Sequence, residues 1–138
     1  MKNKILLLQN ALNNLGIRNS SKGMDLVIVS HSSGKDITIK VLARSGPAPA
    51  GGKGALAIDW WIGESIIADV IALIDLSTER IWIFNKPDIP RYAQQHPPGR
   101  YHLYMYTDRN VNVRCSGKCF TYEFNEFLIE NNYRQILK

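Results

Sequence analysis

The segment from Asp69 to Leu76 reads Asp-Val-Ile-Ala-Leu-Ile-Asp-Leu, and it is apolar at successive positions instead of at alternate ones. A strand of this composition has no face suited to water, so it is expected at the centre of a sheet that is covered on both sides. The chain has 138 residues, of which 45% are hydrophobic, and this is enough for a proper core. We therefore expect one domain over residues 1–138 with this strand at its centre.

The remaining pattern predicts a helix, a run of strands and short closing helices. Apolar residues recur at helical spacing over residues 3–15, and Gly16 is placed to end that helix. Apolar runs or period-two alternation predict further strands at 24–30, 36–43, 56–62, 80–84 and 100–106. A short helical or irregular stretch is expected at 87–95 and a closing helix at 121–132. This order predicts an α/β (α+β) fold with a mixed central sheet flanked by N-terminal and C-terminal helices.

The strands at 24–30 and 36–43 are predicted to form an antiparallel hairpin, because only a short Ser- and Gly-containing loop separates them. Asp25 lies at the start of the first strand. The second strand reads Ile-Thr-Ile-Lys-Val-Leu-Ala, with Lys40 and Leu42 two residues apart and therefore on one face. A turn centred near residues 32–33 places Asp25 opposite residues 40–42, so that it faces Lys40.

This order of elements resembles the restriction-endonuclease-like PD-(D/E)xK nuclease superfamily. Three further segments support the resemblance, namely Ala-Asp-Val-Ile at 68–71, Ile-Phe-Asn-Lys-Pro at 83–87 and Asn-Asn-Tyr-Arg-Gln-Ile-Leu at 131–137. The resemblance implies the sheet fold, a DNA or RNA partner, and a metal site. In that site an Asp, then a carboxylate or amide, then a Lys act on the phosphodiester. The corresponding residues here are Asp25, Lys40 and Leu42, so this chain is similar to a degenerate member.

Metal-dependent hydrolysis needs carboxylate oxygens around a divalent ion. The ammonium group of Lys40 repels such an ion, Leu42 cannot donate to phosphate, and residues 3–15 contain no Asp or Glu. We therefore expect a catalytically inactive nuclease-fold domain, without a cofactor, that binds nucleic acid or a protein partner. Two alternatives stay open: an oligomerising interaction module with no nucleic-acid role, and an active Mg²⁺-dependent endonuclease with a relocated site. The candidates for a relocated site are Asp36, Asp59, Glu64 and Asp69.

The formal charge of +5 is compatible with a polyanionic partner. The predicted nucleic-acid-binding residues are Lys22, Lys35, Arg44 and Lys53, which lie in sequence near the hairpin and the glycine-rich loop at 46–54. That loop has few apolar anchors and is expected to be mobile. A second basic group accompanies tyrosines between residues 100 and 118, and two interpretations stay open for it. It forms either a phosphate- and base-binding surface or a solvated face beside core aromatics.

Cys115 and Cys119 are separated by Ser-Gly-Lys, and we interpret them as two reduced thiols beside a turn. The three histidines, at 31, 96 and 102, lack the paired spacing of a zinc site. Reduced thiols predict a cytoplasmic location. No segment approaches the length of a membrane span, so no membrane partner is expected.

Overall fold

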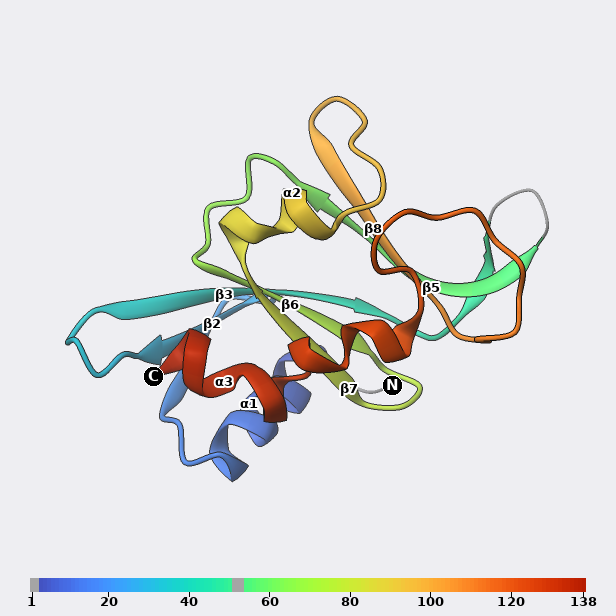
Figure 1. Ribbon diagram of the computed structural model, residues 1–138. Coiled ribbons are helices and arrows are strands. Elements are labelled where there is room, and N and C mark those ends of the chain that lie inside the picture. Colours follow the sequence, from blue (N-terminus) through green and yellow to red (C-terminus); the bar gives the residue numbers. More distant parts are fainter. Residues whose placement is uncertain (1–2, 51–53) are drawn as a thin grey trace.

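The computed structural model describes residues 3–50 and 54–138, which form two sheets and short helices (Figure 1). A five-stranded sheet has the order β1-β2-β3-β6-β7, and a three-stranded sheet has the order β4-β5-β8. The elements are α1 (Lys4–Asn14), β1 (Asn19–Lys22), β2 (Leu26–Ser30), β3 (Asp36–Arg44), β4 (Ala48–Ala50), β5 (Ala55–Gly63), β6 (Val70–Asp75), β7 (Arg80–Asn85), η1 (Lys86–Asp88), α2 (Ile89–Tyr92), β8 (Arg100–Tyr106), η2 (Thr121–Phe127) and α3 (Ile129–Leu137).

The five-stranded sheet is mixed, as the sequence predicts. Strands β2 and β3 form the expected antiparallel hairpin, with Val27 opposite Ile39, and Gly34 takes a positive φ of 89° in its turn. Strand β3 runs parallel to β6 because the chain leaves the end of β3, forms β4 and β5, and then returns. Strand β7 is antiparallel to β6.

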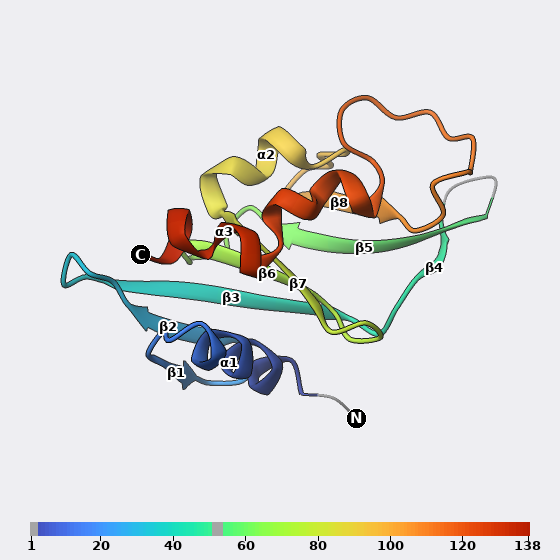
Figure 2. The ribbon, with the colours of Figure 1, turned by 60° about the horizontal axis from the view of Figure 1, so that its bottom comes forward.

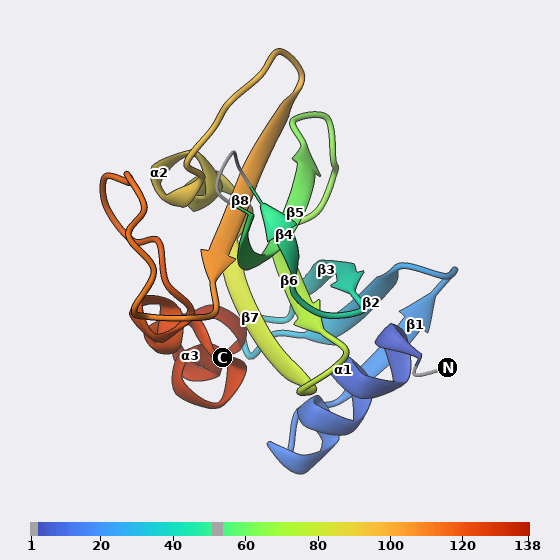
Figure 3. The same ribbon diagram turned by 90° about the vertical axis from the view of Figure 1, so that its right-hand side faces the viewer.

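Two apolar cores lie on opposite faces of the five-stranded sheet. Helices α1 and α3 cover one face, and the three-stranded sheet with α2 and η2 covers the other (Figure 3). In Figure 2, β3 runs between α1 on one side and β5 on the other. All six residues of β6 are buried, and their side chains alternate between the two cores. The prediction that this strand is buried on both faces is confirmed, and it lies inside the sheet between β3 and β7, although β3 holds the middle position.

The closing helix predicted at 121–132 is wrong in its boundaries. A 3-10 segment, η2, covers residues 121–127, and the α-helix α3 begins only at Ile129. Leu128 between them is extended, with φ −56° and ψ 139°, and it bridges to Trp82 of β7. The break lets Phe124 and Phe127 both reach the ring of Phe84, at centroid distances of 6.5 Å and 4.5 Å.

The two short strands β1 and β4 were not predicted. Strand β1 reads Asn-Ser-Ser-Lys and pairs with β2 at the sheet edge, where polar residues are tolerated. Within the glycine-rich loop, Ala48–Ala50 form β4 against β5, so this part is ordered in a ladder. Residues 51–53 of the same loop lie outside the described residues. In the described ranges, no helix is long and apolar enough to cross a lipid bilayer.

Candidate functional site

The candidate centre lies at the open end of the β2–β3 hairpin, where the sequence places the degenerate nuclease signature. The register sets Leu26 opposite Lys40, and the Val41 amide donates to the carbonyl of Asp25 at 2.8 Å. Lys40 Nζ forms an ion pair and a hydrogen bond with Asp25 Oδ2. The side chains are 23% and 42% exposed, so the pair is half-buried and reachable by solvent. The predicted contact between Asp25 and Lys40 is confirmed.

A second ammonium group approaches the same centre from α1. Lys4 Nζ donates to the carbonyl of Val41 at 3.0 Å, directly beside Lys40 in the chain. The hydrogen bond from Lys40 is the main reason why the pKa of Asp25 lies below its ordinary value, and the charge of Lys4 lowers it further. One carboxylate therefore lies among two ammonium groups. The sequence predicts that α1 supplies no carboxylate here, but it gives no signal that α1 supplies a cation.

Leu42 is the residue expected from the sequence resemblance to stand in place of the signature's lysine. It lies two residues after Lys40 on the same strand and is half-buried against the core under the three-stranded sheet. An apolar side chain there has no donor for a phosphate oxygen.

The predicted basic residues do not form one patch. Lys35 precedes β3 and Arg44 ends it, so about 30 Å of extended strand separates them. Lys22 ends β1 opposite Leu26, at a height along the sheet between Lys35 and Arg44. All three are exposed. Lys53 lies outside the described residues.

The side chain of Arg44 forms an ion pair with a carboxylate of the three-stranded sheet. Its Nη2 lies 3.2 Å from Oδ1 of Asp59, and the other oxygen of Asp59 lies 2.8 Å from Nε2 of His102 on β8. Gln95 Oε1 lies 3.2 Å from the second ring nitrogen of this histidine. The partners come from four separate segments, so sequence spacing carries no signal for this group.

Of the other acids considered for a relocated site, Asp69 and Glu64 have partners of their own. Asp69 Oδ2 accepts hydrogen bonds from the amide and the hydroxyl of Thr38, at 2.9 Å and 3.1 Å, and so ties β3 to the start of β6. Glu64 pairs with His96, and Asp36 is exposed at the start of β3. Across residues 3–50 and 54–138, no three His, Cys, Asp or Glu side chains are grouped so that they could hold a metal ion.

Asp75 is a buried carboxylate that the sequence did not single out. It is fully buried at the end of β6, and it accepts from the Ser77 amide at 3.0 Å, the Ser77 hydroxyl at 2.6 Å and the Thr78 hydroxyl at 2.8 Å. Arg80 lies 3.5 Å away. Burial raises the pKa of Asp75, but these hydrogen bonds outweigh it and the net pKa is lowered. This residue closes the β6–β7 turn and has a structural role.

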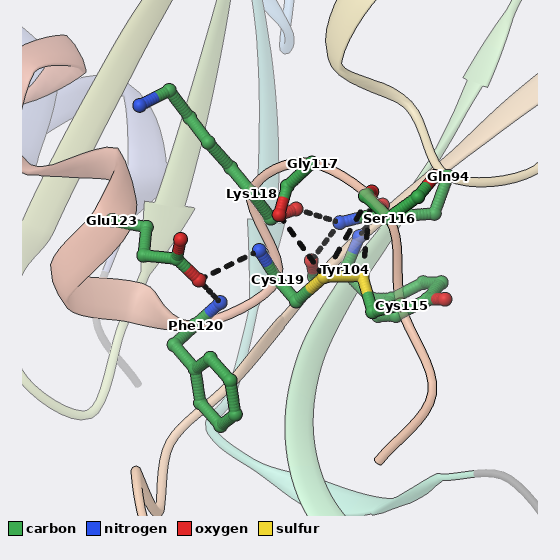
Figure 4. The surroundings of a disulfide bond; sticks show 9 residues. All are labelled: Gln94, Tyr104, Cys115, Ser116, Gly117, Lys118, Cys119, Phe120 and Glu123. Atoms are coloured by element: carbon green, nitrogen blue, oxygen red, sulfur yellow. Dashed lines mark hydrogen bonds between the residues drawn. A yellow bond between two sulfur atoms is a disulfide. The ribbon is translucent and has the colours of Figure 1, made fainter.

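The interpretation of the cysteines as reduced thiols is wrong, because Cys115 and Cys119 form a disulfide with a Cα–Cα distance of 6.2 Å (Figure 4). Three intervening residues with a glycine at φ 79° let the chain turn back on itself, which spacing alone did not reveal. Glu123 fixes the end of this turn by accepting from the Cys119 and Phe120 amides, at 3.1 Å and 3.2 Å. The expectation of a cytoplasmic location rested on reduced thiols and loses that support.

Comparisons with known proteins support the fold alone. No protein-family model matches the chain, and no curated protein is detectably similar to it in sequence. Among solved structures, the bacterial homing endonuclease I-Ssp6803I is similar, with a TM-score of 0.50 and 12% sequence identity. The similarity covers 80% of this chain and 79% of that one. The chain therefore has a nuclease-like fold.

Proposed function

We propose that this protein is a nucleic-acid-binding domain that does not hydrolyse its ligand, built as a degenerate member of the restriction-endonuclease-like PD-(D/E)xK superfamily. The β2–β3 hairpin, with Asp25 before its first strand and Lys40 and Leu42 on its second, supports membership. The nuclease-like fold and the net charge of +5 support a nucleic-acid partner.

The observation that carries the loss of hydrolysis is the ion pair between Asp25 and Lys40. A divalent ion between water and phosphate needs at least two hard oxygen ligands at about 2 Å. At this centre the one carboxylate is already neutralised by an ammonium group, and Lys4 adds a second positive charge nearby. A divalent ion entering here would meet a net positive field.

A relocated site is the weaker alternative. Asp59 lies on β5 and Asp69 lies just before β6, in different sheets. Both oxygens of Asp59 and Oδ2 of Asp69 are engaged in hydrogen bonds or ion pairs. To bind a metal ion, Asp59 would have to release Arg44 and His102.

Two assays test the proposal together. In the first, fluorescence anisotropy with labelled single-stranded and duplex oligonucleotides across a salt series should show binding that weakens steeply with salt, because phosphate contacts release counterions. In the second, the same oligonucleotides incubated with Mg²⁺ or Mn²⁺ should remain intact. Light scattering on the free and bound protein would detect a homo-oligomer.

Cleavage by the wild-type protein that is abolished by a chelator and by Asp25→Ala would contradict the proposal. Cleavage that survives Asp25→Ala but is lost in Asp59→Asn or Asp69→Asn would establish the relocated site in its place. Absence of salt-dependent binding to both oligonucleotides would remove the nucleic-acid role.

A further inference from the structure

The outer face of the three-stranded sheet carries a row of aromatic and cationic side chains. Strand alternation turns Trp60 into the core, where it is 2% exposed, and turns its neighbour Trp61 outward, where it is 39% exposed. On β8 the same alternation sends Arg100, His102 and Tyr104 to the outer face beside Trp61, which pairs with His102.

Three of these side chains, Arg100, Trp61 and His102, form a stack, and Tyr104 lies tilted at its end. The guanidinium of Arg100 lies 4.0 Å from the ring centroid of Trp61. The Trp61 ring lies 4.0 Å from the His102 ring, centroid to centroid, at an interplanar angle of 5°. The His102 ring lies 5.3 Å from that of Tyr104 at an angle of 53°. Because Asp59 and Gln95 hold both nitrogens of His102, the stack has a fixed orientation before any ligand arrives.

A basic cleft of about 560 Å³ adjoins the Tyr104 end of this stack. It lies between residues 91–95 and the disulfide turn, and Figure 4 shows Gln94 and Tyr104 beside that turn. Gln94 fixes the walls by hydrogen bonds to the carbonyls of Tyr104, at 2.7 Å, and Lys118, at 3.0 Å. Hydrogen bonds from Gln94 therefore join the segments on the two sides of the cleft.

The cleft is positive. Arg91, Arg114 and Lys118 line it, and no Asp or Glu is among its described lining residues. Lys118 pairs with Glu126 at 2.9 Å, whereas Arg91 and Arg114 are exposed and have no ion pair with any described residue. Two unpaired guanidinium groups facing one cleft are suited to the oxygens of a phosphate.

We propose that this stack and the adjoining cleft bind single-stranded nucleic acid, with bases on the stack and a phosphate between Arg91 and Arg114. The proposal rests on the proposed function and names its ligand and its surface. A duplex keeps its bases stacked on one another, so only an unpaired strand can offer base faces to Trp61 and Tyr104. A base reaches the face of Trp61 by displacing the exposed Arg100, whose guanidinium then contacts the backbone of the strand.

The test compares four variants by fluorescence anisotropy with a labelled oligothymidine and with a duplex of equal length. Trp61→Ala should weaken oligothymidine binding between about 5-fold and about 150-fold, the range expected for one base–aromatic contact. Arg91→Gln/Arg114→Gln should weaken it and reduce the salt slope by about 1.4, because two single-strand phosphate contacts are lost. Arg18→Gln/Arg134→Gln removes two exposed arginines on the helical side and should bind as the wild type does.

Trp61 supplies a second readout, because its emission should change when oligothymidine replaces Arg100 on its ring. Circular dichroism confirms that each variant is folded. If Lys22→Gln/Lys35→Gln abolishes binding while Trp61→Ala and Arg91→Gln/Arg114→Gln bind normally, the assignment of the binding surface is refuted. The nucleic-acid role stands in that case. Preference for the duplex overturns the single-strand assignment. If the wild type binds neither oligonucleotide, the proposed function fails as well.

Discussion

Reversing the charge at the candidate centre should create a divalent-ion site. In Lys40→Glu a second carboxylate replaces the ammonium group that pairs with Asp25. A divalent ion about 4 Å from one unit charge gains or loses about 2 kcal/mol in a water-like dielectric. We use that dielectric because the side chains of Asp25 and Lys40 are 42% and 23% exposed. Replacing one positive charge by one negative charge therefore favours the ion by about 4 kcal/mol, or about a thousandfold in affinity.

Thermal unfolding with and without Mn²⁺ measures this change. With free Mn²⁺ at about ten times its dissociation constant, Lys40→Glu should gain about 1.4 kcal/mol of stability. For a chain of this size that gain raises Tm by about 5 °C. The wild type should gain nothing at the same concentration, and Lys40→Gln should lie between the two. Calorimetric titration with Mn²⁺ gives the affinity directly.

Asp25→Asn combined with Lys40→Glu is the matched control, since it keeps the new carboxylate and removes the old one. This double variant should lose most of the Mn²⁺ stabilisation. Equal stabilisation of the wild type and Lys40→Glu would refute the argument that the Lys40 charge excludes the metal ion. Full stabilisation of the double variant would show that Asp25 is not a ligand. A cleavage assay of the double variant Lys40→Glu/Leu42→Lys with Mn²⁺ then tests whether phosphodiester hydrolysis is restored.

Three further outcomes are expected. Asp75→Ala should destabilise the protein by about 2 kcal/mol in urea unfolding, because it removes the charged acceptor of three hydrogen bonds from Ser77 and Thr78; a loss below 1 kcal/mol would contradict this role. The lowered pKa of Asp75 adds stability that is complete above its unfolded pKa of about 3.9 and is lost as pH falls through the lower folded pKa. Between pH 5 and pH 2, the free energy of unfolding should therefore fall less steeply for Asp75→Asn than for the wild type. Reducing the Cys115–Cys119 disulfide should cost about 2 kcal/mol, as expected for so short a loop; thiol titration of the unfolded protein before and after reduction checks that the bond was present.

Much of the fold follows from the sequence because the inner strands of the five-stranded sheet have strong apolar patterns. Strand β6 has no polar face, and β2 and β3 flank a short loop that leaves few registers. The two strands that were not predicted have no such pattern, since β1 is polar and β4 has three residues. The boundary between η2 and α3 depends on two phenylalanines packing on Phe84, which is a tertiary effect that local periodicity does not encode.

The candidate site was predictable only where it depends on local register. The contact between Asp25 and Lys40 follows from the length of one turn. The approach of Lys4 depends on how α1 docks, and the contact between Asp59 and His102 depends on the pairing of strands far apart in sequence. Lys35 and Arg44 show a simpler limit: β3 is nine residues long, so two basic residues that flank it in sequence lie at opposite ends of the strand.

Strand β6 has a consequence for how the molecule opens. Val70, Ala72 and Ile74 contribute to the core beneath the helices, while Ile71 and Leu73 contribute to the core beneath the second sheet. If either layer separated from β6, it would expose apolar side chains of a strand that is still part of the core on the other face. Its amides should therefore exchange with solvent only through global unfolding, whereas those of β1 and β4 exchange through local fraying. The face of β5 and β8 that we propose to bind single-stranded nucleic acid thus packs against a core strand that does not open on its own.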